Sequence, residues 1–335
     1  MSSKVRCAVI GSGFAGSTLA ESIQYVPDAE LVVIAGGRKA PELAARFGVR
    51  ASDDVDGVLD SDEVDAVFIA SPNPFHRPQT VRAAQRGKHV LVEKPLALSV
   101  ADGQAMIEAC QKAGVVLMVG HHQRFRRNGV AAKLLLDRGV IGRVDMVAMN
   151  ETEPDQTTWL NAPENGGYLF GGGSHAFDLL NYWIGRIRRV AALTGQYRGV
   201  PVENGSLVLL EFESGAHGSF QNSVIPNMLR PSGGGVLRFD AWITGETGVL
   251  SVDLYGEVRQ STASGWLVHT SFPTWEGHYA FMRMEAYAAQ AREFIAAIRE
   301  RRPPLHGPEQ ALHAVAVCEA AHRAAAEERW VRVEA

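Results

Sequence analysis

The 335-residue chain has little net charge, few cysteines and no long apolar run. Its three cysteines, Cys7, Cys110 and Cys318, are odd in number and widely spaced, which excludes a disulfide framework and a cysteine-based metal site. A net charge of −4 excludes the strongly basic surface of a nucleic-acid-binding protein. No apolar stretch reaches the length of a membrane span, and the first residues lack the apolar core of a signal peptide. We therefore expect a cytoplasmic protein with no nucleic-acid or membrane partner.

Short apolar segments alternate with helix-like segments over the first 123 residues. Such alternation predicts a doubly wound parallel sheet, because a parallel strand needs a crossover helix before the next strand. The expected strands are residues 5–10, 31–35, 65–70, 90–92 and 115–119, and the expected helices are residues 17–26, 41–47, 79–86 and 101–113.

The pattern changes after residue 123, where runs rich in β-branched and aromatic residues follow one another. Those runs predict a mixed or antiparallel open-faced sheet. We expect an α/β domain at residues 1–123 and an α+β domain at residues 124–335, with the last helices able to pack back on the first domain. The expected strands are residues 144–151, 189–197, 206–213, 217–224, 237–244, 248–254 and 266–272, with an edge strand at 330–333; the expected helices are residues 130–138, 281–302 and 308–328.

A glycine-rich turn follows the first strand and precedes the first helix. In the segment Gly11-Ser12-Gly13-Phe14-Ala15-Gly16, Gly11 allows a tight turn and Gly13 lets backbone N–H groups approach a pyrophosphate. Gly16 lets the helix pack closely on the strand, and the helix N-terminus supplies an anion site. This context predicts a Rossmann domain that binds a dinucleotide.

The end of the second strand bears on the choice of cofactor. NAD-specific sites usually place an acid near this point, but the segment Gly36-Gly37-Arg38-Lys39 contains none and carries two cations. We therefore favour NADP over NAD, with Arg38 at the 2′-phosphate; the alternative is that both cations are solvated turn residues. The expected cofactor-binding residues are Gly11, Gly13, Phe14, Ala15, Gly37, Arg38, Ser71, Pro72, Asn73, His76, Glu93, Lys94 and Gln123.

A lysine stands at the end of the fourth expected strand. Pro95 cannot continue the strand that runs from Val90 to Val92, so Lys94 is held at its carboxyl end. Ligands of open α/β sheets bind at that edge, where a lysine can hydrogen-bond a substrate hydroxyl. On these residues alone, a solvated lysine in a strand-to-helix turn is an equal alternative.

Taken in order, these motifs resemble the glucose–fructose oxidoreductase, inositol dehydrogenase and MocA family (Gfo/Idh/MocA). The segments that carry the resemblance are Gly11 to Gly16, Ala70 to Asn73 with His76, Gly87 to Pro95, Arg124-Phe125, and Gly171 to Asp178. The resemblance is close through residue 125 and continues to Asp178.

The resemblance implies an NAD(P)-dependent dehydrogenase or reductase that acts on a carbinol of a sugar, cyclitol or similar polyol. The family's Glu-Lys-Pro lysine and its G-x-H-x-x-D histidine correspond to Lys94 and His175, which would handle the hydroxyl proton. Family members commonly pair through their C-terminal sheets, so a homo-oligomer, a dimer or a tetramer, is implied. Many members also carry an acid four residues before this histidine, where this chain has Gly171.

The expected substrate-binding residues combine the resemblance with the need of sugars for aromatic faces and hydrogen-bond donors. Packing is an equal alternative for Trp159 and Tyr168, and His121 and His122 are either at the mouth of the site or ordinary loop residues. No carboxylates or thiols stand near these histidines at ligand spacing, so we expect no metal. The expected substrate-binding residues are Lys94, His122, Arg124, Trp159, Tyr168, His175 and Asp178.

Two other functions remain open at this point. One is cleavage of a glycoside by transient oxidation with a regenerated NAD(P), as some relatives in the same superfamily perform. The other is a non-catalytic sensor that binds NAD(P), although the presence of both Lys94 and His175 argues against it.

Overall fold

The computed structural model describes residues 4–155, 161–197, 199–226, 238–272 and 278–334. The chain divides into two compact units, the first formed by Met1–His122 with Tyr287–Leu312 and the second by Gln123–Ala286 with His313–Ala335. The sequence places a domain boundary between residues 123 and 124, whereas the first compact unit also takes in a segment from near the C-terminus. Helices α8 (His278–Glu300) and α9 (Pro308–Glu327) each contribute residues to both units.

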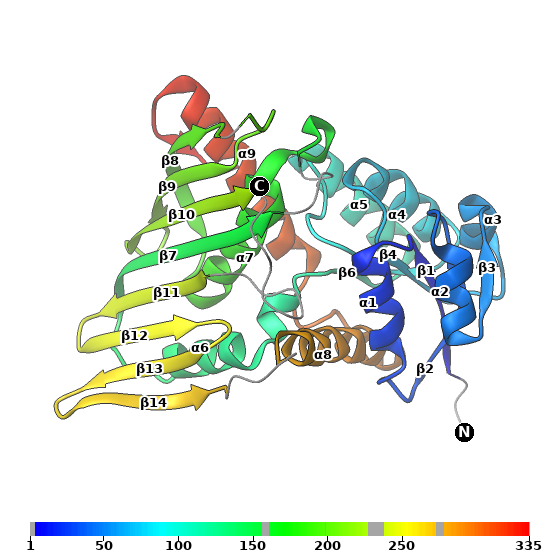
Figure 1. Cartoon of the computed structure of the whole chain (residues 1–335), viewed down its shortest axis with the longest axis horizontal. Helices are drawn as coiled ribbons and strands as arrows, with labels where there is room; N and C mark the ends of the chain where they lie inside the picture. Colours follow the sequence, from blue (N-terminus) through cyan, green and yellow to red (C-terminus); the bar gives the residue numbers. More distant parts are fainter. Residues whose placement is uncertain (1–3, 156–160, 198, 227–237, 273–277, 335) are drawn as a thin grey trace. The chain divides into compact units, whose positions relative to one another are not determined.

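The first unit is built on a six-stranded sheet in the order β3-β2-β1-β4-β5-β6, and all of its strand pairs are parallel (Figure 1). This confirms the predicted doubly wound sheet. The chain reverses direction in the strand order between β1 and β4, so the loops after these two strands meet at the carboxyl edge, where dinucleotides bind. The strands are β1 (Val5–Ile10), β2 (Ala29–Ala35), β3 (Arg50–Ser52), β4 (Ala66–Ile69), β5 (His89–Val92) and β6 (Leu117–Val119).

The helices of the first unit follow the predicted order, with the short helices α3 and η1 in addition. The sequence did not predict β3 or α3, because both are short and neither has a clear apolar periodicity. Helix α3 is nevertheless well capped, since the Asp54 carboxylate accepts a hydrogen bond from the Gly57 N–H at 2.8 Å. The helices are α1 (Phe14–Ile23), α2 (Ala40–Phe47), α3 (Val55–Asp60), η1 (Asn73–Phe75), α4 (His76–Gln85) and α5 (Val100–Ala113).

The second unit is built on a nine-stranded sheet in the order β14-β13-β12-β11-β7-β10-β9-β8-β15. Strand β10 pairs with β7 in parallel and the other pairs are antiparallel, which confirms the predicted mixed sheet. The sequence did not predict β13, whose residues are mostly polar. The strands are β7 (Val144–Asp155), β8 (Ile187–Gly195), β9 (Gly205–Phe212), β10 (His217–Pro226), β11 (Arg238–Gly245), β12 (Gly248–Asp253), β13 (Glu257–Thr262), β14 (Gly265–Ser271) and β15 (Val331–Arg332).

The two faces of this sheet differ in character. Side chains alternate along a strand, so Val147 and Met149 lie on one face, called here the inner face, and Met146 lies on the outer face. Helix α7 (Ser174–Trp183) packs on the inner face, where the Phe177 and Phe220 rings meet edge to face with centroids 5.2 Å apart. Helix α6 (Arg127–Asp137) lies beside β12, β13 and β14 in the same unit (Figure 1).

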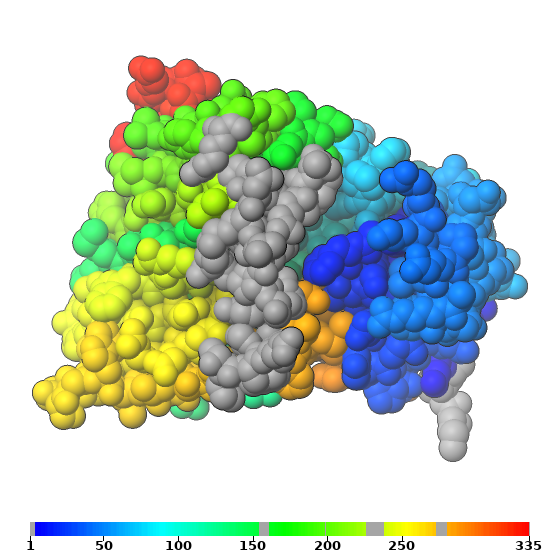
Figure 2. Space-filling model, viewed as in Figure 1, coloured from blue at the N-terminus to red at the C-terminus, as the bar shows by residue number. Residues whose placement is uncertain are grey.

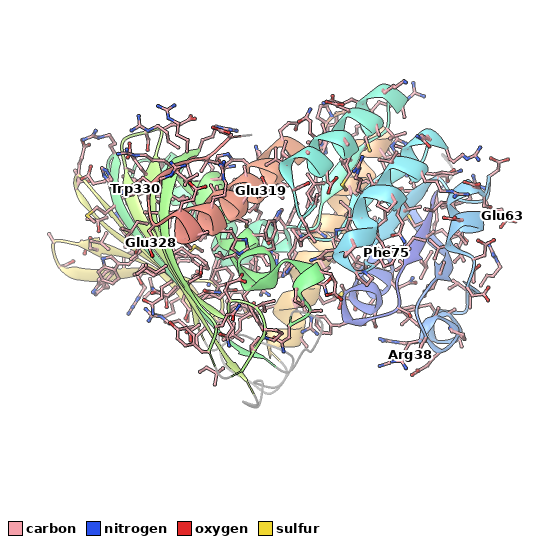
Figure 3. All side chains as sticks on the ribbon, turned by 90° about the horizontal axis from the view of Figure 1, so that it is seen from above. Arg38, Glu63, Phe75, Glu319, Glu328 and Trp330 are labelled. Atoms are coloured by element: carbon pink, nitrogen blue, oxygen red, sulfur yellow. The ribbon has the colours of Figure 1, made fainter. Side chains whose placement is uncertain are left out.

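Helix α9 joins the second unit through buried polar contacts. The His313 ring nitrogen Nε2 accepts a hydrogen bond from the Ile187 N–H at 3.0 Å, and the Cys318 thiol donates to the Leu169 carbonyl at 3.2 Å. Figure 3 shows α9 beside the strands of this sheet, with Glu319, Glu328 and Trp330 labelled. All three cysteines are free and buried. In the described residues, no helix is both long and apolar enough to cross a membrane.

Candidate active site

The glycine-rich turn has the geometry that a pyrophosphate site requires. Gly11 has a φ of +105°, and a Cβ there would lie 2.5 Å from the Ala70 carbonyl oxygen. A Cβ at Gly16 would lie 2.0 Å from the Gly11 carbonyl oxygen, so only glycine lets α1 pack at this distance. A Cβ at Gly13 would meet no described atom within 4 Å, and no described side chain caps α1. The space in front of Gly13, at the start of α1, fits a bound dinucleotide.

The end of β2 lies next to this turn. Gly37 has a φ of +81°, and a Cβ there would lie 2.5 Å from the Ser12 hydroxyl oxygen. Arg38 and Lys39 follow it and are both exposed. Figure 3 shows Arg38 at the surface of the first unit, with its side chain directed outward. Two exposed cations thus follow the end of β2, next to the glycine turn.

A hollow of about 1150 Å³ lies in the same unit, along α3 and α4. Val55 in its lining is next to the β2 end, because a Cβ at Gly36 would lie 2.9 Å from the Val55 side chain. Phe75, which is 53% exposed, and Gln79 also line it. The sequence analysis did not single out these three residues, since an isolated Val, Phe or Gln carries no motif.

His76 connects two of the predicted cofactor-binding segments. Its ring is buried, with Nδ1 2.9 Å from the Pro95 carbonyl oxygen and Nε2 3.0 Å from the Ser71 carbonyl oxygen. Burial lowers the pKa of His76, although hydrogen bonds to these carbonyls oppose the shift. His76 therefore holds the loop after β4 against the turn after β5. The hydroxyl of Ser71 is also engaged, since it donates to the Gln79 side-chain oxygen at 2.6 Å.

Lys94 lies directly after β5, at the carboxyl edge of the first sheet, and the Lys94–Pro95 peptide bond is cis. The Glu93 carboxylate beside it is buried and accepts a hydrogen bond from the Lys94 N–H at 3.2 Å. Burial raises the pKa of Glu93 to about 7, although the Lys94 charge and this hydrogen bond oppose the shift. An acid that titrates near neutral pH therefore stands next to the proposed catalytic lysine.

The surroundings of Glu93 come from the end of β6 and from α8. A Cβ at Gly120 would lie 3.2 Å from the Glu93 carboxylate, so the end of β6 packs closely against the end of β5. The Tyr287 hydroxyl from α8 donates a hydrogen bond to Glu93, and its ring stacks on that of His122 with centroids 4.4 Å apart. A residue distant in sequence thus completes the environment of the Glu-Lys-Pro segment.

His175 is the second residue of α7 and is 6% exposed. A π-helical turn, Leu169–Gly173, runs directly into α7, and π-turns occur frequently at functional sites. This turn contains the three glycines that the sequence analysis placed before the histidine. The structure thus presents His175 from a helix start in the second unit, whereas Lys94 belongs to the first unit.

The π-helical turn is fastened by a carboxylate from the segment before β9. Glu203 Oε1 accepts a hydrogen bond from the Leu169 N–H at 2.8 Å and lies 3.2 Å from the His322 ring nitrogen Nε2 of α9. A Cβ at Gly167 would lie 2.1 Å from Glu203 Oε2, so a side chain there would displace this carboxylate. Nothing in the local sequence around Glu203 marks it, since its role depends on contacts with distant segments.

Arg124 and Asp178, two predicted substrate-binding residues, bind each other. Arg124 donates from Nε to Asp178 Oδ2 at 2.6 Å and from Nη2 to Oδ1 at 2.7 Å, and both side chains are at most 2% exposed. Two parallel charge-assisted hydrogen bonds of this kind fix the relative geometry of the two side chains. It fixes α7 to the segment that follows β6.

Two more of the predicted residues, Gln123 and Tyr168, lie in the second unit. Gln123 bonds through its side chain to Arg126 and Tyr255. Tyr168 is 1% exposed and donates from its hydroxyl to the Asn161 side chain at 3.2 Å, so it both packs and makes a polar contact. Trp159 lies outside the described residues. Of the predicted cofactor-binding residues, Gln123 is the one that belongs to the second unit.

A Rossmann unit with an open glycine turn, followed by a mixed-sheet unit, defines a dinucleotide-binding protein of two units. Residues 5–121 match the Gfo/Idh/MocA oxidoreductase family with an NAD-binding Rossmann fold, and residues 133–333 match the C-terminal alpha/beta domain of this family. The chain belongs to this family, which confirms the resemblance seen in the motifs.

The relatives of the chain include dehydrogenases. Over 98% of this chain and 99% of that protein, it is 29% identical to the myo-inositol 2-dehydrogenase of Thermotoga maritima. It is 34% identical to an uncharacterized oxidoreductase of Streptococcus pneumoniae, over 57% of this chain and about half (53%) of that protein. A crystal structure of GenD2 from gentamicin A biosynthesis, in complex with NAD, is 31% identical, covers 100% of this chain and 98% of that chain, and has a TM-score of 0.86. These relatives assign the chain to the oxidoreductases that act on CH–OH groups.

Proposed function

We propose that the chain transfers hydride between NAD(P) and a secondary carbinol, or the corresponding ketone, of a sugar, a cyclitol or a sugar derivative. The observation that carries this proposal is the placement of Lys94 at the carboxyl end of β5, in the same unit as the glycine turn that leads into α1. The relatives support the substrate class, since one is named a myo-inositol 2-dehydrogenase and another belongs to gentamicin A biosynthesis.

The proposal assigns the hydroxyl proton to Lys94 and His175. His175 accepts the proton in oxidation and returns it in reduction, because an ordinary imidazole exchanges protons near neutral pH. Lys94 donates a hydrogen bond to the same oxygen and stabilises the negative charge that develops there. The nicotinamide, when bound, supplies the hydride acceptor or donor. The ion pair between Arg124 and Asp178 then holds α7, the helix that carries His175, in place.

We assign the dinucleotide to the residues of the first unit. The turn Gly11 to Gly16 would bind the pyrophosphate, and the hollow lined by Val55, Phe75 and Gln79 would hold the adenosine end. Arg38 favours NADP, because a guanidinium forms charge-assisted hydrogen bonds with a 2′-phosphate and no acid stands at the β2 end to bind a free 2′-hydroxyl.

We also propose a homo-oligomer that forms through the outer face of the nine-stranded sheet. Register places Leu207, Leu209 and Trp242 on this face, and each is at least 40% exposed. The Trp242 and Trp266 rings meet at 5.5 Å, which extends the apolar surface towards β14. In Figure 2, the side chains of β11–β14 (yellow) lie at the surface of the second unit. An apolar sheet face of this kind is typical of protein–protein contacts.

The experiment that tests the function is a fluorescence titration with NADPH and NADH, followed by a carbohydrate panel read at the nicotinamide absorbance band. Binding of a cofactor together with a polyol-dependent absorbance change is the expected result. Product without net absorbance change would indicate the glycoside-cleaving cycle instead. Failure of both cofactors to bind would refute the proposal.

The Lys94→Ala variant tests the assigned chemistry. Loss of the hydrogen bond and positive charge at the reacting oxygen is expected to lower kcat by about 100-fold or more. The affinity for the cofactor is expected to stay within about twofold, because the phosphate sites of the glycine turn are intact. Turnover equal to that of the wild type would remove Lys94 from the mechanism.

A further inference from the structure

A buried carboxylate lies on the inner face of the second sheet, next to the helix that carries His175. Glu151 belongs to β7, and its side chain is 3% exposed. On the same face, β7 carries Met149 two residues earlier and Val147 four residues earlier, and both are buried. The strand therefore changes from apolar to charged on its buried face. Packing alone does not require this change, because burying a carboxylate carries a large desolvation cost that another apolar side chain would avoid.

The neighbouring strands change character at the same level. In register, Glu151 stands opposite Asn222 of β10, and Asn222 stands opposite Ser206 of β9. All three side chains are buried, and the Ser206 hydroxyl donates to the Asn222 side-chain oxygen at 2.5 Å. One step earlier, Phe220 stands opposite Met149. Because β7 and β10 are parallel, Glu151 and Asn222 of this polar row both lie in the carboxyl-terminal half of their strands.

This polar row meets the π-helical turn before α7. A Cβ added at Gly172 would lie 2.5 Å from Glu151 Oε2 and 3.0 Å from the Glu151 carboxyl carbon. Gly172 stands three residues before His175, so the carboxylate packs against the turn that leads into the helix of the histidine. A side chain at position 172 would collide with the carboxylate. The contact therefore explains why glycine occupies this position.

We propose that Glu151 is a substrate-binding and specificity-determining residue of the proposed dehydrogenase. Its carboxylate accepts a hydrogen bond from a hydroxyl adjacent to the reacting carbinol, and the Asn222 amide lies beside it for a further hydroxyl. Gly171 stands where many family members carry an acid. In this chain, Glu151 of the sheet then supplies the carboxylate instead. This inference rests on the proposed function, because it assigns the polyol to the surroundings of His175.

The test compares wild type with Glu151→Gln, using myo-inositol, scyllo-inositol and their monodeoxy analogues as probes in the presence of the cofactor. Loss of a hydrogen bond to a charged acceptor is expected to lower kcat/KM for the intact polyol by about 10- to 100-fold. For the analogue that lacks the contacted hydroxyl, kcat/KM is expected to change by less than about threefold, since this analogue makes no such bond in either protein. The affinity for NADH is expected to remain unchanged.

Two further variants separate binding from folding. Asp240→Asn is the matched control, because Asp240 bonds Asn150 on the opposite face of the same strand pair. This control variant is expected to leave kcat/KM unchanged for every polyol. Gly172→Ala keeps the carboxylate but displaces it, so it is expected to repeat the Glu151→Gln pattern. Equal losses on the intact polyols and on all deoxy analogues, or full activity of Glu151→Gln, would overturn the proposal.

Calorimetry distinguishes failure of this inference from failure of the proposed function. If no polyol is turned over, binding of the same polyols to the NADH complex is measured instead. Binding by the wild type that Glu151→Gln weakens would support Glu151 although the proposed oxidation fails. Equal binding by both proteins, or no binding by the wild type, would overturn the role assigned to Glu151.

Discussion

At the scale of single residues, Glu93 links the Glu-Lys-Pro segment to the stability of the fold. Its pKa is about 7 in the folded chain, against an ordinary value of 4.5. Between these values the folded state retains a proton that the unfolded state releases, so the free energy of unfolding falls as pH rises. The contribution is fully present below pH 4.5 and is lost by about pH 7, and its size is roughly 3 kcal/mol.

The Glu93→Gln variant is expected to lack this pH dependence, because glutamine does not titrate. Urea denaturation at several pH values between 4.5 and 8 measures the free energy of unfolding of both proteins. The difference between Glu93→Gln and wild type should grow in favour of the variant as pH rises. Glu108→Gln serves as the control, since Glu108 lies on an exposed helix surface. A constant difference across this range would contradict the assignment.

Arg38 determines the choice between the two cofactors if it binds a 2′-phosphate. Arg38→Ala is expected to weaken NADPH binding by about 10- to 100-fold, the range of a charge-assisted hydrogen bond. NADH binding should change by less than about twofold, because this cofactor has no phosphate there. Fluorescence titration measures both affinities, with Arg46→Ala as a control on an exposed arginine of α2. Equal losses for both cofactors would assign Arg38 a different role.

Residues with local motifs were predictable, and residues that act through distant contacts were not. Gly11, Gly16 and Lys94 follow from the order of strand, turn and helix, because their roles depend on their immediate neighbours. Glu151 meets the π-helical turn from β7 and Glu203 meets it from the segment before β9, so no spacing in the sequence marks them.

At the scale of elements, α7 depends on a buried ion pair. Asp178→Asn removes the partner charge of Arg124, which is 1% exposed and would remain buried as an uncompensated cation. The expected loss of stability is about 3 kcal/mol or more. Urea denaturation measures it, and the exposed pair Arg127–Glu285 provides the comparison. Glu285→Gln should lower the free energy of unfolding by less than about 1 kcal/mol, since solvent screens that pair. Equal losses in the two variants would show that the buried Arg124–Asp178 pair contributes no more to stability than the exposed pair.

The elements that the sequence predicted are those with a clear apolar period. The buried strands β1 and β4 and the long helices α5, α8 and α9 were found with boundaries within a few residues. Strand β13 was missed because its residues alternate too weakly, and β3 because it is only three residues long. The π-helical turn was missed as well, since three consecutive glycines indicate a flexible loop unless the packing partner is known.

At the scale of the whole molecule, the outer face of the second sheet is the proposed interface between copies of the chain. Trp242→Glu places a charge in the centre of the apolar face and is expected to convert an oligomer into monomers, because desolvating an unpaired carboxylate opposes association. Analytical ultracentrifugation measures the mass in solution. Tyr25→Glu, which changes an exposed aromatic residue of the first unit, is the control. A monomeric wild type, or an unchanged mass of Trp242→Glu, would contradict the proposed interface.

The division of the chain into units has a consequence for its synthesis. The first unit includes Tyr287–Leu312, and the Phe68 ring of β4 packs edge to face on Phe294 of α8 with centroids 5.3 Å apart. A ribosome makes strands β7 to β14 of the second sheet before it reaches Phe294, so part of the apolar core of the nascent first unit stays uncovered until then. Domains that fold as continuous segments avoid this delay. A growing chain of this protein therefore offers chaperones an apolar surface near Phe68 until translation has passed α8.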